Sequence, residues 1–341
     1  MHWIGLDHIR ALAALLVFSW HFMHGHDGAP ISFDGAHILS IVDEGHTGVA
    51  LFMTLSGYLF AKLLDGKTVA YLPFFWTRFL RLAPLMLVVV IAEALRLYWI
   101  GADLRGYAVN IAKSPLTGAL PNGGWSIIVE AHFYFLLPAL LFVLHRDRRY
   151  FLAVLLTFVS LRLAIYAVGY DIHRYAYGTI IGRMDQFVLG LAAFFYRDLI
   201  RGRHIAAVTV GAAFLAFYYA FDAAGGVSSG PAWVWVILPT VEGVAYAFLI
   251  AWYDQSFRHS HGPVSRFIAK MGDYSYSIYL LHYFVVFYVS AFIARHVMDL
   301  SNFYVAFVWS ILMYLAMMPI GYLSMRFIEN PPRRFRKRYV R

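Results

Sequence analysis

Several ionisable side chains stand inside strongly apolar stretches of this 341-residue sequence, where they are the first candidates for chemistry. They are Arg10, His21, Glu93, Arg96, Glu130, Arg162, Glu242 and His282. An ionisable group in hydrocarbon is costly, so we expect these residues to line a site or a path. A histidine can remove a proton from a hydroxyl group, and a carboxylate can orient or charge that histidine. The sequence has no cysteine, which excludes disulfides and a thiol nucleophile.

Arg10 and His21 lie eleven positions apart in the first apolar stretch, LDHIRALAALLVFSWHF. On an α-helix this spacing returns to within about 20° of the same face and separates the two residues by about 16 Å along the axis. The spacing therefore predicts one polar helix face. A pair of buried polar residues that only holds helices together explains the same pattern.

Glu130 lies in LPNGGWSIIVEAHFYFLLP, four residues after Ser126, so both side chains share a helix face. Counted from opposite ends of their helices, His21 and Glu130 reach a similar depth, about 21 to 22 Å into a core of about 30 Å. We therefore expect Glu130 to be able to orient or charge His21. The alternative is that Glu130 pairs with Arg10 or Arg162 as a structural ion pair.

Two further motifs suit a donor substrate. Ser56 and Gly57 in GVALFMTLSGYLF fall near the membrane centre, where glycine permits close approach of a helix or a ligand, and helix packing is the favoured interpretation. Arg78 and Arg81 in WTRFLRLAPL are neighbours on one helix side. Their guanidinium groups suit the phosphates of a nucleotide-like donor, but anchoring at the membrane interface explains them as well and is the favoured interpretation from these residues alone.

The histidines other than His21 lie in less specific patterns. His282 in GDYSYSIYLLHYFVV lies about 13 Å into its helix, where it could line the donor path or act as a hydrogen-bonded packing residue. A group near one membrane surface invites a metal interpretation: His24, His26, His37 and His46. Their spacing is not diagnostic of metal ligands, so we expect no metal site.

The elements that position these residues follow from the composition, because 61% of the residues are hydrophobic and only 14% are charged. Many stretches approach or exceed the roughly 18 apolar residues that a membrane-crossing helix needs. We predict an all-α, polytopic helix bundle that forms one membrane-embedded domain over residues 1–341, with a basic tail over 329–341. Ten membrane helices are expected, at residues 6–23, 46–64, 79–100, 125–144, 150–170, 184–197, 204–221, 232–253, 274–294 and 303–327.

The formal charge of +9 does not indicate a nucleic-acid partner, because Lys and Arg are concentrated in short loops and the tail. The loops after the second, fourth, sixth and eighth predicted helices are basic, whereas 24–45 and 222–231 contain no Lys or Arg. The positive-inside rule therefore predicts that both termini are cytoplasmic.

Seven segments in order along nearly the whole chain resemble the acyltransferase 3 family of integral membrane acyltransferases, which includes O-antigen and other polysaccharide O-acetylases. They are LDHIRALAALLVFSWHF, GVALFMTLSGYLF, RFLRLAP, GGWSIIVEAHFYFLLP, GRMDQFVLGLAAFF, GDYSYSIYLLHYFVV and RFIENPPRR. The resemblance implies a ten-helix fold that moves an acyl group, in our interpretation acetyl, from cytoplasmic acyl-CoA to a cell-envelope or exported glycan. It implies no permanently bound cofactor and a place in the bacterial inner membrane, among its lipids.

The resemblance also implies roles for residues at the matching positions. Arg10 and His21 are the expected catalytic pair, with His21 as general base and Glu130 beside it. The expected donor-binding residues are Arg78, Arg81, Ser56 and Gly57. The residues expected in the acceptor site or pocket are Trp125, Ser126, Asp185, Tyr279 and His282.

Two departures from the family pattern stand out. Glu130 is followed by Ala131 and His132 where relatives often have a second acidic residue and Gln, and His8 replaces a frequent Gly. Some relatives carry a fused hydrolase-like domain, so we expect this chain to act alone or with a separate partner.

Other functions fit the same residues. The acceptor could be a small molecule or a lipid-linked sugar, and transfer could pass through an acyl-enzyme on Ser56, Ser126 or His21. A transporter or flippase also uses buried ionisable groups, but it predicts paired broken helices in internal repeats, which the sequence does not show. A non-enzymatic scaffold predicts that Arg10, His21 and Glu130 are dispensable.

Overall fold

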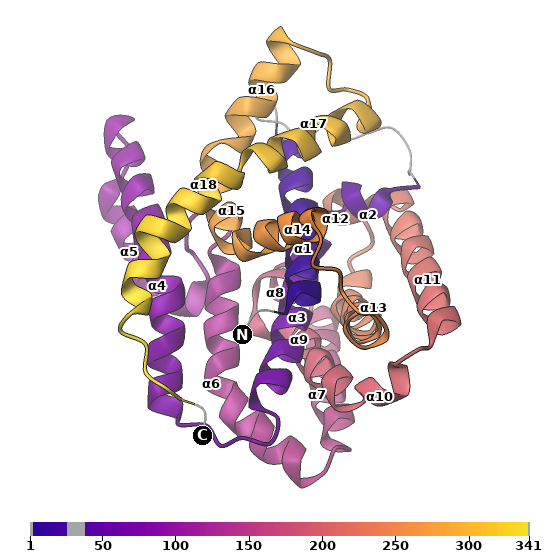
Figure 1. Cartoon of the computed structure of the whole chain (residues 1–341). Helices are drawn as coiled ribbons and strands as arrows, with labels where there is room; N and C mark the ends of the chain where they lie inside the picture. The colour runs from indigo at the N-terminus through magenta and orange to yellow at the C-terminus, as the bar shows by residue number, and fades with distance from the viewer. Residues whose placement is uncertain (1–2, 26–37, 340–341) are drawn as a thin grey trace.

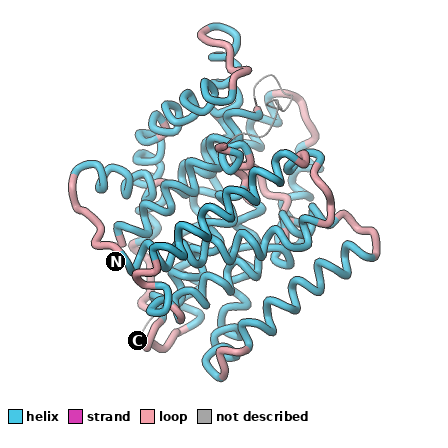
Figure 2. Tube along the Cα trace, turned by 90° about the vertical axis from the view of Figure 1, so that its right-hand side faces the viewer, coloured by secondary structure: helices cyan, strands magenta, loops and turns pink. Residues whose placement is uncertain are grey.

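The computed structural model describes residues 3–25 and 38–339, and within these residues the chain is helical with no strand, which confirms the all-α prediction (Figures 1 and 2). The longer elements are α1 (Ile4–His24), α3 (Thr47–Leu64), α4 (Tyr71–Trp99), α6 (Trp125–Arg146), α7 (Tyr150–Ala167), α9 (Ile180–Phe195), α11 (His204–Ala223), α13 (Val234–Ser256), α16 (Val286–His296) and α17 (Phe303–Ala316). The connecting elements are α2 (Ser40–Asp43), α5 (Leu104–Thr117), α8 (Ile172–Gly178), α10 (Arg197–Ile200), α12 (Gly226–Ser229), α14 (Pro263–Asp273), α15 (Ser275–Leu281), η2 (His282–Phe284), α18 (Met318–Ser324), η3 (Met325–Glu329) and α19 (Asn330–Arg333).

Within the described part of the chain, six helical segments are long and apolar enough to cross a membrane: α3, α6, α7, α11, α13 and the run from Phe303 to Arg333. The segment from Ser275 to His296 is a seventh candidate that is bent by 58°. Each of the ten predicted spans coincides with a helical segment. Three of these helices, α1, α4 and α9, are not among the candidate membrane spans. α1 and α4 carry several ionisable side chains, and α9 has only 16 residues. The count of ten crossings and the cytoplasmic termini therefore stay predictions.

The centre of the bundle is formed by α1, α3, α9 and α13, with α4 and α5 at one edge and α11 at the other (Figure 1). Glycines allow the central helices to approach closely. A Cβ atom added at Gly57 of α3 would collide with the carbonyl oxygen of Phe187 in α9, and one at Gly190 would collide with that of Thr54. The structure thus confirms the helix-packing interpretation of Gly57.

Two buried ion pairs fix α9 to its neighbours. The guanidinium of Arg162 in α7 donates to Asp185 at 2.9 Å and to the hydroxyl of Thr240 at 2.7 Å, and neither charged side chain is exposed. Arg183 of α9 lies 3.4 Å from Glu242 of α13. Because an unpaired buried charge is costly, these pairs fix how α7, α9 and α13 fit together.

The chain folds back so that its two described ends meet. Trp3, just before α1, and Tyr339, after α19, line the same cavity. The basic tail is therefore a packed part of the bundle.

Candidate active site

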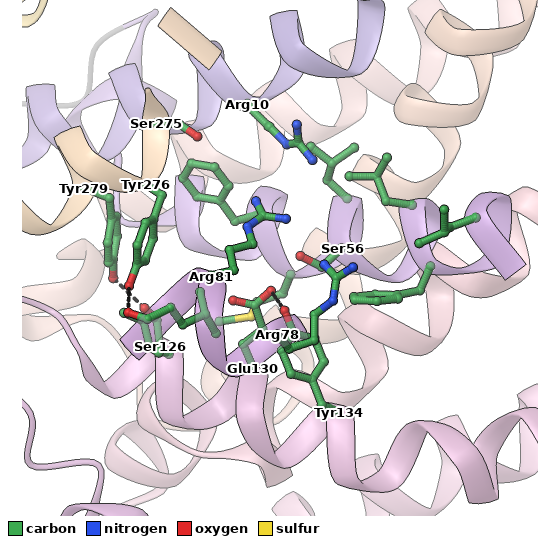
Figure 3. A pocket seen from close by; sticks show the side chains of 18 of the residues that line it. Arg10, Ser56, Arg78, Arg81, Ser126, Glu130, Tyr134, Ser275, Tyr276 and Tyr279 are labelled. Atoms are coloured by element: carbon green, nitrogen blue, oxygen red, sulfur yellow. Dashed lines mark hydrogen bonds between the residues drawn. The ribbon is translucent and has the colours of Figure 1, made fainter. Parts of the chain in front are cut away.

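A cavity of about 320 Å³ lies between α1, α3, α4, α6 and α15 (Figure 3). Its polar lining consists of Arg10, Ser56, Arg78, Arg81, Ser126, Glu130, Tyr134, Ser275, Tyr276, Tyr279, Arg336 and Tyr339. Apolar side chains from α3 and α4 complete the walls, among them Met53, Leu59 and Leu82. The cavity can thus hold a ligand with both apolar and polar parts.

A second cavity of about 490 Å³ adjoins the first. We call this second cavity the vestibule and the first one the inner cavity. It is lined by Lys67, Thr77, Arg78, Arg81, Arg336, Lys337, Arg338 and Tyr339. Arg78, Arg81, Arg336 and Tyr339 line both cavities, so the two spaces adjoin along these four side chains. No carboxylate is among the described residues that line the vestibule, which makes it a strongly cationic chamber.

Glu130 is the only carboxylate among the described residues lining the inner cavity, and its α6 neighbour Tyr134 donates a hydrogen bond to it. Arg81 of α4 lines the same space (Figure 3). Both structural pairings considered for Glu130 are wrong, because Arg10 pairs with Asp7 at 2.5 Å and Arg162 pairs with Asp185. Glu130 thus lines the inner cavity and is not part of an ion pair with Arg10 or Arg162.

Ser126 and Tyr279 close one part of this cavity. The Ser126 hydroxyl donates to the Tyr279 oxygen at 2.9 Å (Figure 3). The Tyr279 hydroxyl donates to the carbonyl oxygen of Gly123 at 3.0 Å. Tyr279 also touches the ring of His282, with centroids 6.2 Å apart. One tyrosine therefore contacts both the cavity and a histidine beyond it.

His282 belongs to a pair with His21. The Nε2 atom of His282 lies 3.2 Å from Nδ1 of His21, and the Tyr283 hydroxyl lies 2.7 Å from Nε2 of His21. A break in the helix at η2, between α15 and α16, presents His282 and Tyr283 to α1. His282 is buried, whereas His21 is partly exposed.

Backbone carbonyls fix the hydrogen positions of both rings, because a carbonyl can only accept. Nδ1 of His21 lies 2.9 Å from the Val17 oxygen, and Nδ1 of His282 lies 3.0 Å from the Ile278 oxygen, so both Nδ1 atoms carry hydrogen. His282 Nε2 then accepts from His21 Nδ1–H. The lone pair of His21 Nε2 accepts from the Tyr283 hydroxyl, which is the arrangement of a general base facing a hydroxyl group.

The expected pairing of His21 with Glu130 is not seen, since no hydrogen bond or ion pair between described residues joins them. Arg10 lines the cavity, but it stands about 16 Å along α1 from His21. The two residues of the first helix thus serve different parts of the site, Arg10 the cavity and His21 the region beyond Tyr279.

The structure gathers most of the predicted site residues around the inner cavity: Arg10, Ser56, Arg78, Arg81, Ser126, Glu130 and Tyr279. His21 and His282 form the pair beside it. Two further residues expected in the site are not among the described residues that line the two cavities: Trp125 packs against Tyr177 with ring centroids 4.8 Å apart, and Gly57 packs against α9. Asp185 is absent from the described cavity linings and pairs with Arg162, which corrects its assignment to the pocket.

The sequence interpretation missed Tyr283, Tyr134 and the tail residues Arg336 and Tyr339. Tyr283 directly follows His282 within a quoted motif, so its position was a usable signal. The tail was interpreted only as a topology signal. Of the proposed histidine group, His24 pairs with Asp43 at 3.1 Å and His46 with Glu44 at 3.3 Å, while His26 and His37 lie outside the described residues.

Comparison with known proteins places this architecture in context. A family profile described as an acyltransferase domain matches residues 3–326. Curated relatives include three Staphylococcus aureus proteins that are each described as a putative O-acetyltransferase. They are SACOL0978 of strain COL, SAS0844 of strain MSSA476 and SAR0937 of strain MRSA252. Each is 24% identical over 385 aligned positions, which cover 99% of this chain and 58% of the relative's length. No solved structure matches significantly.

Proposed function

Because this chain belongs to the acyltransferase domain family, we propose that it is an O-acyltransferase that moves an acyl group, namely acetyl, from acyl-CoA to a hydroxyl of a cell-envelope or exported glycan. Its family and the six helices of the described residues that are long and apolar enough to cross a membrane indicate an integral membrane protein. Its location in the bacterial inner membrane is part of the proposal. The names of the relatives support acetyl as the group transferred.

The observation that carries this proposal is the hydroxyl group held 2.7 Å from the lone pair of His21 Nε2. In the structure this hydroxyl belongs to Tyr283. An acceptor hydroxyl that takes its place would lie within reach of a base whose tautomer is already set by Val17.

The reaction then needs no oxidant, metal or second base. His21 Nε2 takes the proton of the acceptor hydroxyl while the oxygen attacks the thioester carbonyl carbon. The carbon–sulfur bond breaks, and the imidazolium gives its proton to the departing thiolate, which leaves as the free thiol of CoA. During this step His282 Nε2 accepts from the charged His21 ring and stabilises it.

The donor is expected to lie along the two adjoining cavities. The cationic vestibule suits the nucleotide phosphates, and the inner cavity, with Arg10, Ser56 and Glu130, suits the amide-containing arm that ends in the thioester. Tyr279 stands between this cavity and the histidine pair, so its side chain must yield for the thioester to reach His21.

Transfer of radiolabelled acetyl from acetyl-CoA by the purified protein in proteoliposomes tests the proposal, with crude envelope glycan as acceptor. The wild-type protein should label glycan, whereas His21→Ala and Arg81→Ala should not. Parallel reactions with a lipid-linked sugar and a small hydroxyl compound identify the class of acceptor. Absence of CoA release with every acceptor would overturn the enzymatic function.

A further inference from the structure

The last described residues of the chain form one wall of the vestibule. After α19 the segment 334–339 runs back along the beginning of α4 and contributes Arg336, Lys337, Arg338 and Tyr339 to the vestibule lining. Charged tails of soluble proteins are commonly solvated. This one is held by specific hydrogen bonds.

Three carbonyl groups two residues apart anchor this segment. The Phe335 oxygen accepts from the indole N–H of Trp76 at 3.1 Å, and the Lys337 oxygen accepts from the Thr77 hydroxyl at 3.2 Å. The Tyr339 oxygen accepts from the backbone N–H of Ala70 at 2.8 Å. Alternate carbonyls of an extended chain point the same way, so this pattern holds residues 335–339 as a strap along the beginning of α4 that leaves a turn and is extended over 336–339.

The strap brings cations next to other cations. Six of the eight vestibule side chains are Lys or Arg, and no ion pair with a carboxylate is found for Arg78, Arg81 or Arg336 among the described residues. Partial burial, followed by the charges of Arg333, Arg81 and Arg78, lowers the pKa of Arg336 to about 10. Such a concentration of positive charge in the vestibule favours the binding of an anion.

The contacts of Arg78 indicate where that anion binds. Its Nη2 donates to the Tyr339 hydroxyl at 2.5 Å, and its Nε is buried without a hydrogen-bond partner in the described structure. A neutral phenol is a weaker acceptor than a phosphate oxygen. Arg78 therefore has an N–H group without a partner in the described structure, and its Nη2 is held by an acceptor that a phosphate oxygen can replace.

From these contacts we propose that the strap 335–339 is part of the donor site, where Arg336 and Lys337 together with Arg78 bind the phosphate groups of the donor's nucleotide. The Tyr339 hydroxyl holds the place on Arg78 that a phosphate oxygen takes over. This inference rests on the proposed function, since acyl-CoA supplies the phosphorylated nucleotide, but binding of the nucleotide can be measured without any acyl transfer.

The probe for the test is adenosine 3′,5′-bisphosphate, with adenosine as the uncharged comparison. Binding is measured by titration calorimetry on the full chain in nanodiscs of neutral lipid. The double variant Arg336→Gln, Lys337→Gln should bind the bisphosphate at least about tenfold more weakly than wild type, because it loses charge-assisted contacts. The matched control is Arg334→Gln, which removes a charge from the same tail outside both cavity linings and should bind like wild type.

Transfer assays separate a binding defect from misfolding. With acetyl-CoA the double variant should show a raised KM, whereas with S-acetyl-pantetheine, which lacks the nucleotide, its kcat/KM should equal that of wild type. If the wild-type protein binds the bisphosphate and the variant does not, yet no acyl transfer occurs, the phosphate site stands and the proposed function fails.

Two results would overturn the inference. One is equal affinity of wild type and the double variant for the bisphosphate. The other is competition by lipid: anionic phosphatidylglycerol in the nanodiscs abolishes bisphosphate binding by the wild-type protein, and the lipid itself binds the wild-type protein but not the double variant. This result would assign the vestibule to a lipid headgroup.

Discussion

If His21 is the general base, its hydrogen bond to His282 makes a measurable contribution to the rate of acyl transfer. Replacing His282 with phenylalanine keeps a buried aromatic ring beside Phe18 but removes the acceptor that lies 3.2 Å from His21 Nδ1. Between neutral rings such a bond contributes about 1 kcal/mol, and to a charged imidazolium about 1.5 to 3 kcal/mol. The difference of about 0.5 to 2 kcal/mol arises only when His21 becomes charged, so kcat should fall about 2- to 30-fold while KM stays the same.

The assay is steady-state transfer of acetyl to glycan in proteoliposomes, with acceptor in excess. His282→Gln offers a carbonyl oxygen at a similar reach and should recover part of the loss. Melting temperatures in detergent show whether both variants are folded. An unchanged kcat in a folded His282→Phe protein would refute the proposed role of His282, and an equal loss in both variants would assign His282 to packing.

The remaining predictions concern the bundle and the inner cavity. Arg162→Met alone should destabilise the protein by about 3 to 5 kcal/mol because Asp185 stays buried and charged, whereas adding Asp185→Leu should restore much of the stability; thermal unfolding in detergent measures both. Gly57→Ala should lower the yield of folded protein because its methyl group meets a backbone carbonyl of α9, while Gly211→Ala, which has open space around it, should be neutral or stabilising by up to about 1 kcal/mol. Glu130→Gln should lower kcat/KM for acetyl-CoA at least about tenfold, since it removes the carboxylate that faces Arg81, and a folded variant with wild-type kinetics would contradict this.

The helices were predictable because hydrophobic length is a local property of the sequence. All ten expected segments are helical, and the arginines of WTRFLRLAPL do line the cavities. The bend after Phe284 and the helix α14 in the polar stretch 254–273 were not predicted, because both depend on tertiary packing, α14 against α1 and α15 against α1 and α4. The number of membrane crossings is likewise set by the lipid boundary, which hydropathy only approximates.

The partners within the site were less predictable. Helix counting gave His21 and Glu130 a similar depth, but depth does not determine which faces of two helices meet. The structure turns His21 toward His282 and Tyr283, and Glu130 toward Tyr134. The role of the tail was also hidden, because a basic segment satisfies the positive-inside rule whether or not it folds back onto α4.

The broken helix also bears on how acceptor preference can change. Tyr276 and Tyr279, on α15, line the inner cavity, whereas α16 leaves the break at an angle of 58° to α15. In a straight helix, any reorientation of the part after the break would also move the residues of α15 that line the inner cavity. Here the break at His282 to Phe284 gives the two halves different directions, so a change in α16 need not move the residues of α15 that line the inner cavity. Under the proposed function, chimaeras joined at Val285, which carry α16 and the following loop of a relative, are expected to test whether this half sets the preference for the acceptor.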